Sequence, residues 1–252
     1  MTPSLCLCAS VAVFSSARAP WTAEMTKPAV ETLLQGALKR ITNHELHSNT
    51  YLLADPQQSG ACVVVDPGLD RERVEGAIAD SGWRPVAVLC THGHFDHVGS
   101  TAALQERFGV PVYLRAQDQK TAKLSNFLMA AFKIKARIAL PEFTLLADDG
   151  ASVDVAGRHF TFHALPGHTP GSAGILVDGL LFSGDSLYAR RTALSKLPGE
   201  DHDQLRASLK ALFAWIPGDT LVLPGHGGTA TIDQIHAGNE ELRAFMAAAV
   251  PA

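Results

Sequence analysis

The chain has 252 residues, of which 46% are hydrophobic and 18% charged, a composition typical of a globular protein with a sizeable core. Its formal net charge of −4 excludes the broad positive field that nucleic acids require, so we expect a small-molecule substrate and no nucleic-acid partner. No apolar run reaches the roughly 18 residues of a membrane span. The composition leaves the oligomeric state open.

The first 24 residues allow two interpretations. An apolar centre followed by a small-residue Ala-Arg-Ala ending is typical of a secretory signal, but no Lys or Arg precedes Arg18. Residues 1–24 are therefore either a signal peptide or a disordered extension ahead of a start at Met25. We favour the second interpretation, which makes the protein cytoplasmic, whereas the first would make it exported. Residues 25–252 are predicted to form a single domain.

The four cysteines do not suggest a disulfide framework. Cys6 and Cys8 lie in the N-terminal segment, while Cys62 and Cys90 lie inside apolar runs that predict buried strands. We expect Cys62 and Cys90 to act as small core residues. This distribution favours a reducing compartment.

Apolar runs and helical stretches alternate through the first half of the chain. The polar turn "PQQSG" separates two strand-like runs, and a moderately basic amphipathic stretch follows the last strand of this half. The predicted elements are strands over residues 48–55, 61–68, 85–92 and 110–114, and helices over residues 71–81, 101–108 and 117–136.

The second half begins with strand-like alternation. Turns at "DDG" and "AGR" interrupt this pattern between residues 143 and 167, which predicts a β-meander. Both halves run strands first and then helix, so we predict an α/β fold of two sheets with helices outside. The remaining predicted elements are strands over residues 173–179, 180–185 and 220–228, and helices over residues 203–215 and 231–249.

The stretch "THGHFDH" places three histidines and an aspartate directly after a predicted buried strand. With Gly93 between them in a loop, His92 and His94 can converge on one ion. Asp96 and His97 are adjacent, so their side chains diverge, and a shared ion with His92 is hard to arrange. The spacing therefore predicts two neighbouring metal sites, and imidazole with carboxylate suits zinc, iron or manganese.

Three further residues occur in similar settings. His168 lies in "LPGHTPGS" after a strand-like run, Asp185 ends the run "LLFSGD", and His226 follows the run "TLVLPG". Each lies just beyond the C-terminal end of an apolar strand, where ligand sites of α/β sheets gather. The alternative is a set of polar loops in a chain that happens to carry 11 histidines, but the repeated setting favours a metal site.

These motifs resemble the metallo-β-lactamase fold superfamily. The matching stretches are "VVVDPG", "THGHFDH", "PGHTPGS", "FSGDSL" and "PGHG", in this order along the chain. The resemblance implies an αββα four-layer sandwich of two mixed β-sheets with helices on the outer faces and a site at one edge between the sheets. It also implies two divalent metal ions per chain, Zn²⁺ in the first place and Fe or Mn as alternatives, and makes Asp66 an orienting residue. The ligands that it implies are His92, His94 and His168 for the first ion, Asp96, His97 and His226 for the second, and Asp185 for both.

Two such cations a few ångströms apart can lower the pKa of a water between them and present hydroxide as the nucleophile. Asp96 can hold this hydroxide by a hydrogen bond, so Asp96 and Asp185 are the candidate catalytic residues. No serine or cysteine nucleophile is needed. We therefore expect a metal-dependent hydrolase.

Within the superfamily, "PGHTPGS" and "GDSL" resemble the short glyoxalase II-like proteins, because little more than one helix of chain follows His226. The resemblance implies a hydroxyacylglutathione hydrolase-like enzyme that cleaves thioesters of the S-acylglutathione type. Arg190 and Ala193 stand where many relatives have Gly and Asp, a departure in the segment that would recognise glutathione. Among the candidates for substrate binding, Arg190, Arg191, Lys196 and Tyr113 could instead belong to a solvated surface. Phe127 and Phe132 could form a lid or the wall of a pocket, or simply pack a surface helix on the core.

Other reactions fit the same fold. A lactonase of the acyl-homoserine-lactone type needs the same metal pair and differs only in its pocket. Persulfide dioxygenases share the fold but use one iron, at the equivalents of His92, His168 and Asp185. β-Lactam hydrolysis is less expected, because Asp185 occupies a position where those enzymes commonly have cysteine.

Overall fold

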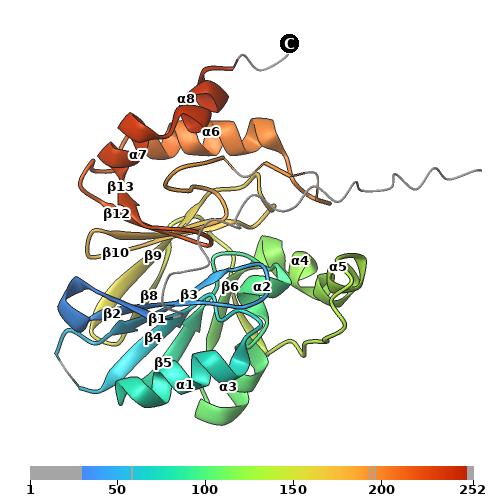
Figure 1. The fold of residues 1–252 in the computed structure, drawn as a ribbon, viewed down its shortest axis with the longest axis vertical. Helices are drawn as coiled ribbons and strands as arrows, with labels where there is room; N and C mark the ends of the chain where they lie inside the picture. The colour runs from blue at the N-terminus through green and yellow to red at the C-terminus, as the bar shows by residue number, and fades with distance from the viewer. Residues whose placement is uncertain (1–29, 58, 193, 196, 249–252) are drawn as a thin grey trace, which may run out of the picture.

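The structure, a computed structural model, describes residues 30–57, 59–192, 194–195 and 197–248 (Figure 1). The predictions made for residues 1–24, for Met25, for Cys6 and Cys8, and for Lys196 lie outside the described residues. Within the described ranges, none of the helices combines the length and apolar character that crossing a membrane requires.

One sheet is formed by the first half of the chain, with its strands side by side in chain order. Neighbouring strands from β1 to β4 are antiparallel, and those from β4 to β7 are parallel. The described strands of this sheet are β1 (Val30–Leu33), β2 (Leu38–Thr42), β3 (Asn49–Ala54), β4 (Ala61–Val65), β5 (Arg84–Leu89), β6 (Val112–Arg115) and β7 (Phe143–Leu146). Because β4, β5 and β6 are parallel, their carboxyl ends meet at one edge.

The second sheet is formed by the second half, in the order β13-β12-β11-β10-β9-β8. Its described strands are β8 (Ala151–Val155), β9 (Arg158–Ala164), β10 (Ala173–Val177), β11 (Leu180–Gly184), β12 (Leu221–Pro224) and β13 (Ala230–Thr231). The pair β11 and β12 is parallel and the other pairs are antiparallel. The parallel pair brings Asp185 and His226, which follow these strands, to the same edge.

Helices cover the outer face of each sheet (Figure 1). Buried residues of α1 and α3 pack on the first sheet, and those of α6, α7 and α8 pack on the second. The described helices are α1 (Arg71–Ser81), α2 (Phe95–Val98), α3 (Thr101–Phe108), α4 (Gln119–Lys123), α5 (Ser125–Ala131), α6 (His202–Phe213), α7 (Ile232–Gly238) and α8 (Glu240–Ala247), with 3₁₀ turns η1 (Leu34–Gly36) and η2 (Ala116–Asp118). The predicted four-layer αββα sandwich is confirmed.

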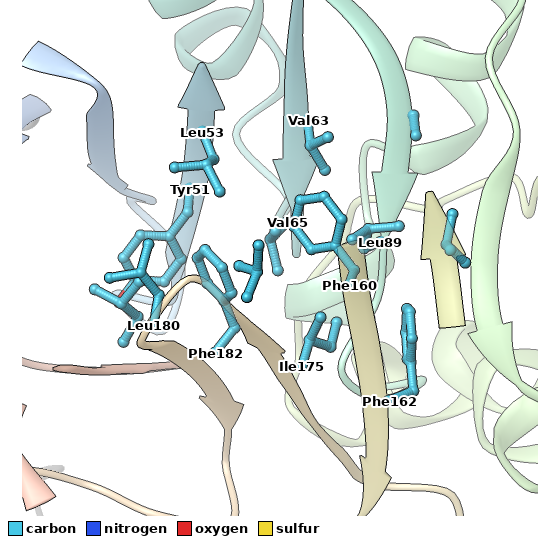
Figure 2. Close-up of a cluster of buried hydrophobic side chains, with 14 of the residues drawn as sticks. Tyr51, Leu53, Val63, Val65, Leu89, Phe160, Phe162, Ile175, Leu180 and Phe182 are labelled. Atoms are coloured by element: carbon cyan, nitrogen blue, oxygen red, sulfur yellow. The ribbon is translucent and has the colours of Figure 1, made fainter. Parts of the chain in front are cut away.

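The main core lies between the two sheets. Side chains of a strand alternate between its faces, so Val63 and Val65 of β4 enter this core, while Val64 packs with the helical layer. Figure 2 shows side chains from both sheets meeting there, among them Val65 and, from the facing sheet, Phe160. The sandwich is therefore held by apolar contact across the sheets.

Cys62 and Cys90 are free thiols with no exposed surface, as predicted for core residues. Cys90 belongs to the cluster between the first sheet and its helices. Burial raises the pKa of both thiols, that of Cys62 to about 12. Both sulfurs therefore remain protonated and act as apolar side chains.

The single helix predicted over residues 117–136 is wrong. The chain forms the 3₁₀ turn η2 and then two short helices, α4 and α5, which meet at Leu124. After α5 it is irregular, because the side chain of Asn126 donates to the carbonyl of Ile138 and accepts from its N–H, both at 2.9 Å. These bonds fold the segment back onto α5, which an amphipathic pattern does not reveal.

The predicted meander over residues 143–167 is also wrong in part. β7 pairs with β6 in the first sheet, whereas β8 and β9 form a hairpin in the second, so "DDG" connects the sheets. The last helix is two, because the side chain of Asn239 accepts from the N–H of Leu242 at 3.0 Å and starts α8. Strands β1, β2 and β13 were not predicted.

The core between the sheets predicts unequal effects of the same substitution at two phenylalanines. Phe160 is 0% exposed and Phe127 is 68% exposed. We expect Phe160→Ala to lower the free energy of unfolding by about 3–5 kcal/mol, because it leaves a cavity. Phe127→Ala should change it by less than about 0.5 kcal/mol. Urea denaturation of both variants at one metal concentration measures the difference, and equal losses would contradict the assignment of Phe160 to the core.

Candidate metal centre

The seven residues predicted as metal ligands meet at the edge where the two sheets expose their carboxyl ends. His92 and His94 follow β5, and Asp96 and His97 lie on α2, directly after them. The loops after β9, β11 and β12 bring in the other three. Within the described residues, the groups whose ligand atoms lie within 4.8 Å of one another are His92–His94–His168, Asp96–His97–His226 and Asp66–His92–His97.

The first cluster joins both sheets through three imidazoles. His94 Nδ1 lies 3.0 Å from His168 Nε2, and the rings of His92 and His168 have centroids 5.0 Å apart. In a tetrahedral zinc site with Zn–N of about 2.0–2.1 Å, neighbouring ligand atoms lie roughly 3.3 Å apart. The spacing of His94 and His168 is close to that value.

The second cluster adds a carboxylate. His226 Nε2 lies 3.3 Å from Asp96 Oδ2, and His97 Nε2 lies 3.6 Å from the same oxygen. The sequence predicted that Asp96 and His97 would serve a different ion from His92 and His94. In the structure, Asp96 and His97 form a cluster with His226, which comes from the other sheet.

Asp185 lies between the two clusters. Its Oδ2 is 3.6 Å from His168 Nε2 and 3.4 Å from His226 Nε2, and its Oδ1 is 3.4 Å from His97 Nε2. One carboxylate therefore reaches an imidazole of the first cluster and two of the second. This is the position that a ligand shared by two ions would take.

Unsatisfied ring nitrogens show that the residues fit metal ions. Buried polar atoms normally have hydrogen-bond partners. In the described part of the chain, buried atoms of these clusters lack a hydrogen-bond partner, among them His92 Nε2, His97 Nε2 and Asp185 Oδ1. A donor set of imidazole and carboxylate suits zinc, iron and manganese alike.

Asp66 fixes the orientation of two ligands. Its Oδ2 lies 3.1 Å from His97 Nδ1 and accepts a 2.7 Å bond from the hydroxyl of Thr91, while its Oδ1 accepts from the Thr91 N–H at 2.7 Å. The same hydroxyl lies 3.1 Å from His92 Nδ1. These contacts leave Nε2 of both rings directed away from Asp66 and Thr91, an arrangement in which a carboxylate can orient two metal ligands.

The backbone of Asp66 has φ of 50°, in the left-handed region that disfavours a residue with a side chain. The hydroxyl of Thr50 donates to its carbonyl at 2.8 Å and stabilises this conformation. Strained backbone of this kind gathers at functional sites.

His226 is oriented in a similar way to His97, because its Nδ1 lies 3.1 Å from the carbonyl oxygen of Leu46.

The surroundings keep two imidazoles of the first cluster neutral. Burial, followed by the neighbouring His97, lowers the pKa of His92 well below its ordinary value. Burial also lowers the pKa of His94 to about 3. Neutral imidazole is the form that binds a metal ion, so both residues are ready as ligands at neutral pH.

The second cluster has the opposite balance. Burial alone would lower the pKa of His97, but the carboxylates of Asp185 and Asp96 hold it well above its ordinary value. The carboxylates likewise raise the pKa of His226 to about 10 against the effect of burial. Although burial raises the pKa of Asp185, His226 and His97 hold it well below its ordinary value. Without an ion, protons on the imidazoles balance the carboxylates, and a cation has to displace them.

A glycine makes room for the shared carboxylate. A Cβ at position 225 would lie 2.1 Å from Asp185 Oδ1 and 2.6 Å from His97 Cε1. Gly225 also ties the sheets together, because its carbonyl accepts from the N–H of Asn49 at 2.6 Å. Only glycine therefore allows the chain before His226 to pass this close to Asp185.

The residues predicted for substrate binding are more dispersed. Tyr113 packs against the core between the sheets. Phe132 lies with its ring 5.8 Å from that of Phe95 on α2, so it is close to the loop of the first cluster. Arg190 is exposed, and Arg191 lines a small cavity with Asp185.

Sequence reasoning missed Tyr188 as a residue of the site. It lines the same small cavity as Asp185, and burial together with this carboxylate raises the pKa of the phenol well above its ordinary value. Its ring lies 6.4 Å from that of His226. Its place three residues after Asp185 was the available signal, but a tyrosine in a loop has many other uses.

Comparison with known proteins agrees with this geometry. The model of the Metallo-beta-lactamase superfamily matches residues 45–226. The chain is 29% identical to the hydroxyacylglutathione hydrolase GloC of Haemophilus influenzae over 195 residues, which are 74% of this chain and 88% of that enzyme.

Two solved structures are similar over most of the chain. The BLEG-1 B3 metallo-β-lactamase superposes with a TM-score of 0.73 at 30% identity, over 81% of this chain and 99% of its own. Protein TTHA1623, solved in a di-iron-bound form, superposes with a TM-score of 0.71 at 32% identity, over 80% of this chain and 98% of its own.

An αββα sandwich with two histidine and aspartate clusters at one edge defines a metallo-hydrolase with a candidate dinuclear centre. The family match spans all seven clustered residues. The chain belongs to the metallo-β-lactamase superfamily.

The close approach at Gly225 predicts that a single methyl group disrupts the centre. Gly225→Ala should push Asp185 and His97 away and lower the metal content of the purified protein below that of the unaltered chain. Gly76→Ala on α1 is the matched control, because a Cβ there meets no atom within 4 Å. Elemental analysis of both variants, prepared without chelator, measures the effect. Full metal content in Gly225→Ala would show that Asp185 is not needed where the structure places it.

Proposed function

We propose that this protein hydrolyses an acyl thioester of the S-acylglutathione type at a centre of two divalent metal ions. The observation that carries the proposal is the position of Asp185, within 3.6 Å of His168 and 3.4 Å of His226. The similarity to the hydroxyacylglutathione hydrolase of Haemophilus influenzae supports the thioester substrate.

On this proposal each ion has three ligands of its own and one shared ligand. The similar protein solved with two irons supports a dinuclear centre and leaves zinc, iron and manganese as candidates. When bound, the ions supply Lewis acids that polarise a carbonyl and lower the pKa of a water. The ligands are His92, His94 and His168 for the first ion, Asp96, His97 and His226 for the second, and Asp185 for both.

The chain's own groups arrange the reactants. His97 and His226 hold the pKa of Asp96 below its ordinary value although burial raises it, so its carboxylate is ionised and can accept a hydrogen bond from a water at the centre. His92 and His97 have no exposed surface, so bulk water does not reach these two side chains.

The segment over residues 119–141 suits an anionic, partly apolar substrate. It contains no acidic residue in a chain of net charge −4, and its basic residues are Lys120, Lys123, Lys133, Lys135 and Arg137. Its exposed large apolar side chains are Leu124, Phe127 and Phe132. The segment contacts the loop that carries His92 and His94, since the Ser125 hydroxyl donates to the Gly93 carbonyl at 3.3 Å. We propose that it attracts the carboxylates of the thiol carrier and covers the acyl group.

β-Lactam hydrolysis is the second candidate function, because the BLEG-1 enzyme superposes on 81% of the chain. A carboxylate at position 185 bridges the two clusters in this structure, and the segment over residues 119–141 offers more charge than a β-lactam needs. Both observations favour the thioester.

Metal removal followed by a substrate panel tests the proposal. The protein prepared without chelator should hold about two ions per chain, hydrolyse S-acyl glutathiones, and lose activity on dialysis against a chelator and regain it with Zn²⁺, Fe²⁺ or Mn²⁺. The panel also contains a neutral acyl thioester, an acyl-homoserine lactone and a β-lactam. Faster hydrolysis of the lactone or the β-lactam than of every thioester would replace the proposed substrate, and a single iron per chain would argue against the dinuclear hydrolase.

Asp185→Asn tests the shared ligand. Loss of an orienting partner commonly weakens metal binding or activity by about 10–100-fold, so replacing a ligand should lower kcat/KM by more than about 100-fold. Asp154→Asn is the matched control, because the side chain of Asp154 is 83% exposed and pairs with His159. Steady-state rates and metal content are measured for both. Wild-type activity in Asp185→Asn would show that the two clusters do not act as one centre.

A further inference from the structure

A buried carboxylate outside the two clusters accepts four hydrogen bonds. Asp118 lies on the turn η2 that follows β6 and has no exposed surface. Its four donors come from three different segments, the loop of His92 and His94, the loop of His168, and helix α4, which directly follows η2. Burying a charge is costly unless each lone pair finds a donor, so this arrangement calls for an explanation.

One oxygen of Asp118 joins the two loops that carry the first cluster. Its Oδ2 accepts from the Gly93 N–H at 2.6 Å and from the Thr169 hydroxyl at 2.9 Å. Gly93 lies between His92 and His94, and Thr169 directly follows His168. Each of the three histidines of the first cluster is therefore adjacent in sequence to a residue that hydrogen-bonds to Asp118.

The other oxygen completes the contact with the loop of His168. Its Oδ1 accepts from the Gly171 N–H at 2.9 Å and from the Thr121 hydroxyl at 3.1 Å. A Cβ at position 171 would lie 2.5 Å from the Asp118 nitrogen, so only glycine lets this loop approach so closely. The loop after β9 is thereby anchored to η2, an element of the other sheet's half of the chain.

The charge of Asp118 fixes the direction of the network. An ionised carboxylate only accepts, so Thr169 must donate to it. Ser172 Oγ, 2.7 Å from Thr169 Oγ1, then donates to Thr169, and the Thr169 N–H donates to Ser172 Oγ at 3.0 Å. An amide in place of the carboxylate has a nitrogen that donates, so a hydroxyl beside that nitrogen would have to accept instead of donate.

We propose that Asp118 is a positioning residue that sets the first cluster, but not the second, in the geometry that binds a metal ion. None of its four donors lies on α2, which carries Asp96 and His97, or in the loop of His226. The inference rests on the proposal that the first cluster binds an ion, and it is independent of the thioester substrate. A role limited to holding the fold together would affect both ions alike.

Asp118→Asn is the decisive variant because it changes charge and not size. Each carboxylate oxygen faces one backbone N–H and one hydroxyl, and only a hydroxyl can turn to accept. The amide nitrogen must therefore leave the N–H of Gly93 or of Gly171 without an acceptor. Metal-free protein is titrated with Co²⁺ alone, and the visible absorption and the chelator competition give the affinity of each ion. We expect one ion to bind about 10–100-fold more weakly and the other to be unchanged.

Thr169 supplies a second, milder test in case Asp118→Asn does not fold. Thr169→Val removes one donor and should weaken the same ion, whereas Thr169→Ser keeps the hydroxyl and should bind Co²⁺ as the wild type does. Asp55→Asn is the control for a lost carboxylate elsewhere, because Asp55 accepts from the Gln57 N–H at 2.9 Å in the turn after β3. It should leave both affinities unchanged.

The thermal unfolding midpoint of each variant is measured without metal, so that a loss of stability is distinguished from a loss of metal affinity. Equal weakening of both ions in Asp118→Asn, or wild-type affinity for both in Asp118→Asn and Thr169→Val, would overturn the inference. A wild-type chain that takes up no Co²⁺ would instead overturn the proposed metal centre itself.

Discussion

Asp96 is buried at the edge of the sandwich and the side chain of Asp185 is only 9% exposed there, and the need to balance the charge of both carboxylates governs the site. Water does not solvate them, so a positive charge must lie beside them. His97 and His226 supply it as protons in the metal-free chain, which the raised pKa of both residues reflects. The same two imidazoles become ligands when a cation takes over this role. One electrostatic requirement thus explains both the unusual pKa values and the metal-binding geometry.

The clustered residues could be predicted from the sequence, because each follows its own strand and the ends of neighbouring strands meet. Asp118 could not be predicted. Two of its donors lie far along the chain, Gly93 at 25 residues and Thr169 at 51 residues from Asp118. The residues around Asp118 in sequence have the pattern of an amphipathic helix, which gives no sign of these contacts. A residue that connects loops has no local pattern, so it becomes visible only when the loops are placed in space. Tyr188 was missed for a different reason, because a tyrosine in a loop near Asp185 has many other uses.

The fold divides in a similar way. Buried strands such as β4 and β5 were predicted because continuous apolar runs mark them. β2 was not, because Arg40 interrupts its pattern; this arginine is nevertheless 5% exposed and donates to the carbonyl of Gly227 at 2.8 Å. The predicted pairing of β7 with the strands after it was wrong, because alternation of apolar and polar residues identifies a strand but not the strand it pairs with. Hydrogen bonds between distant segments decided each of these cases.

Both clusters take ligands from both sheets. His92, His94, Asp96 and His97 follow strands of the first sheet, while His168, Asp185 and His226 follow strands of the second. An ion bound to such a set is a cross-link between the halves of the sandwich, comparable to a disulfide but reversible. The supply of metal would then set the stability of the folded chain as well as its chemistry, because an ion that binds only the folded state shifts the folding equilibrium towards it.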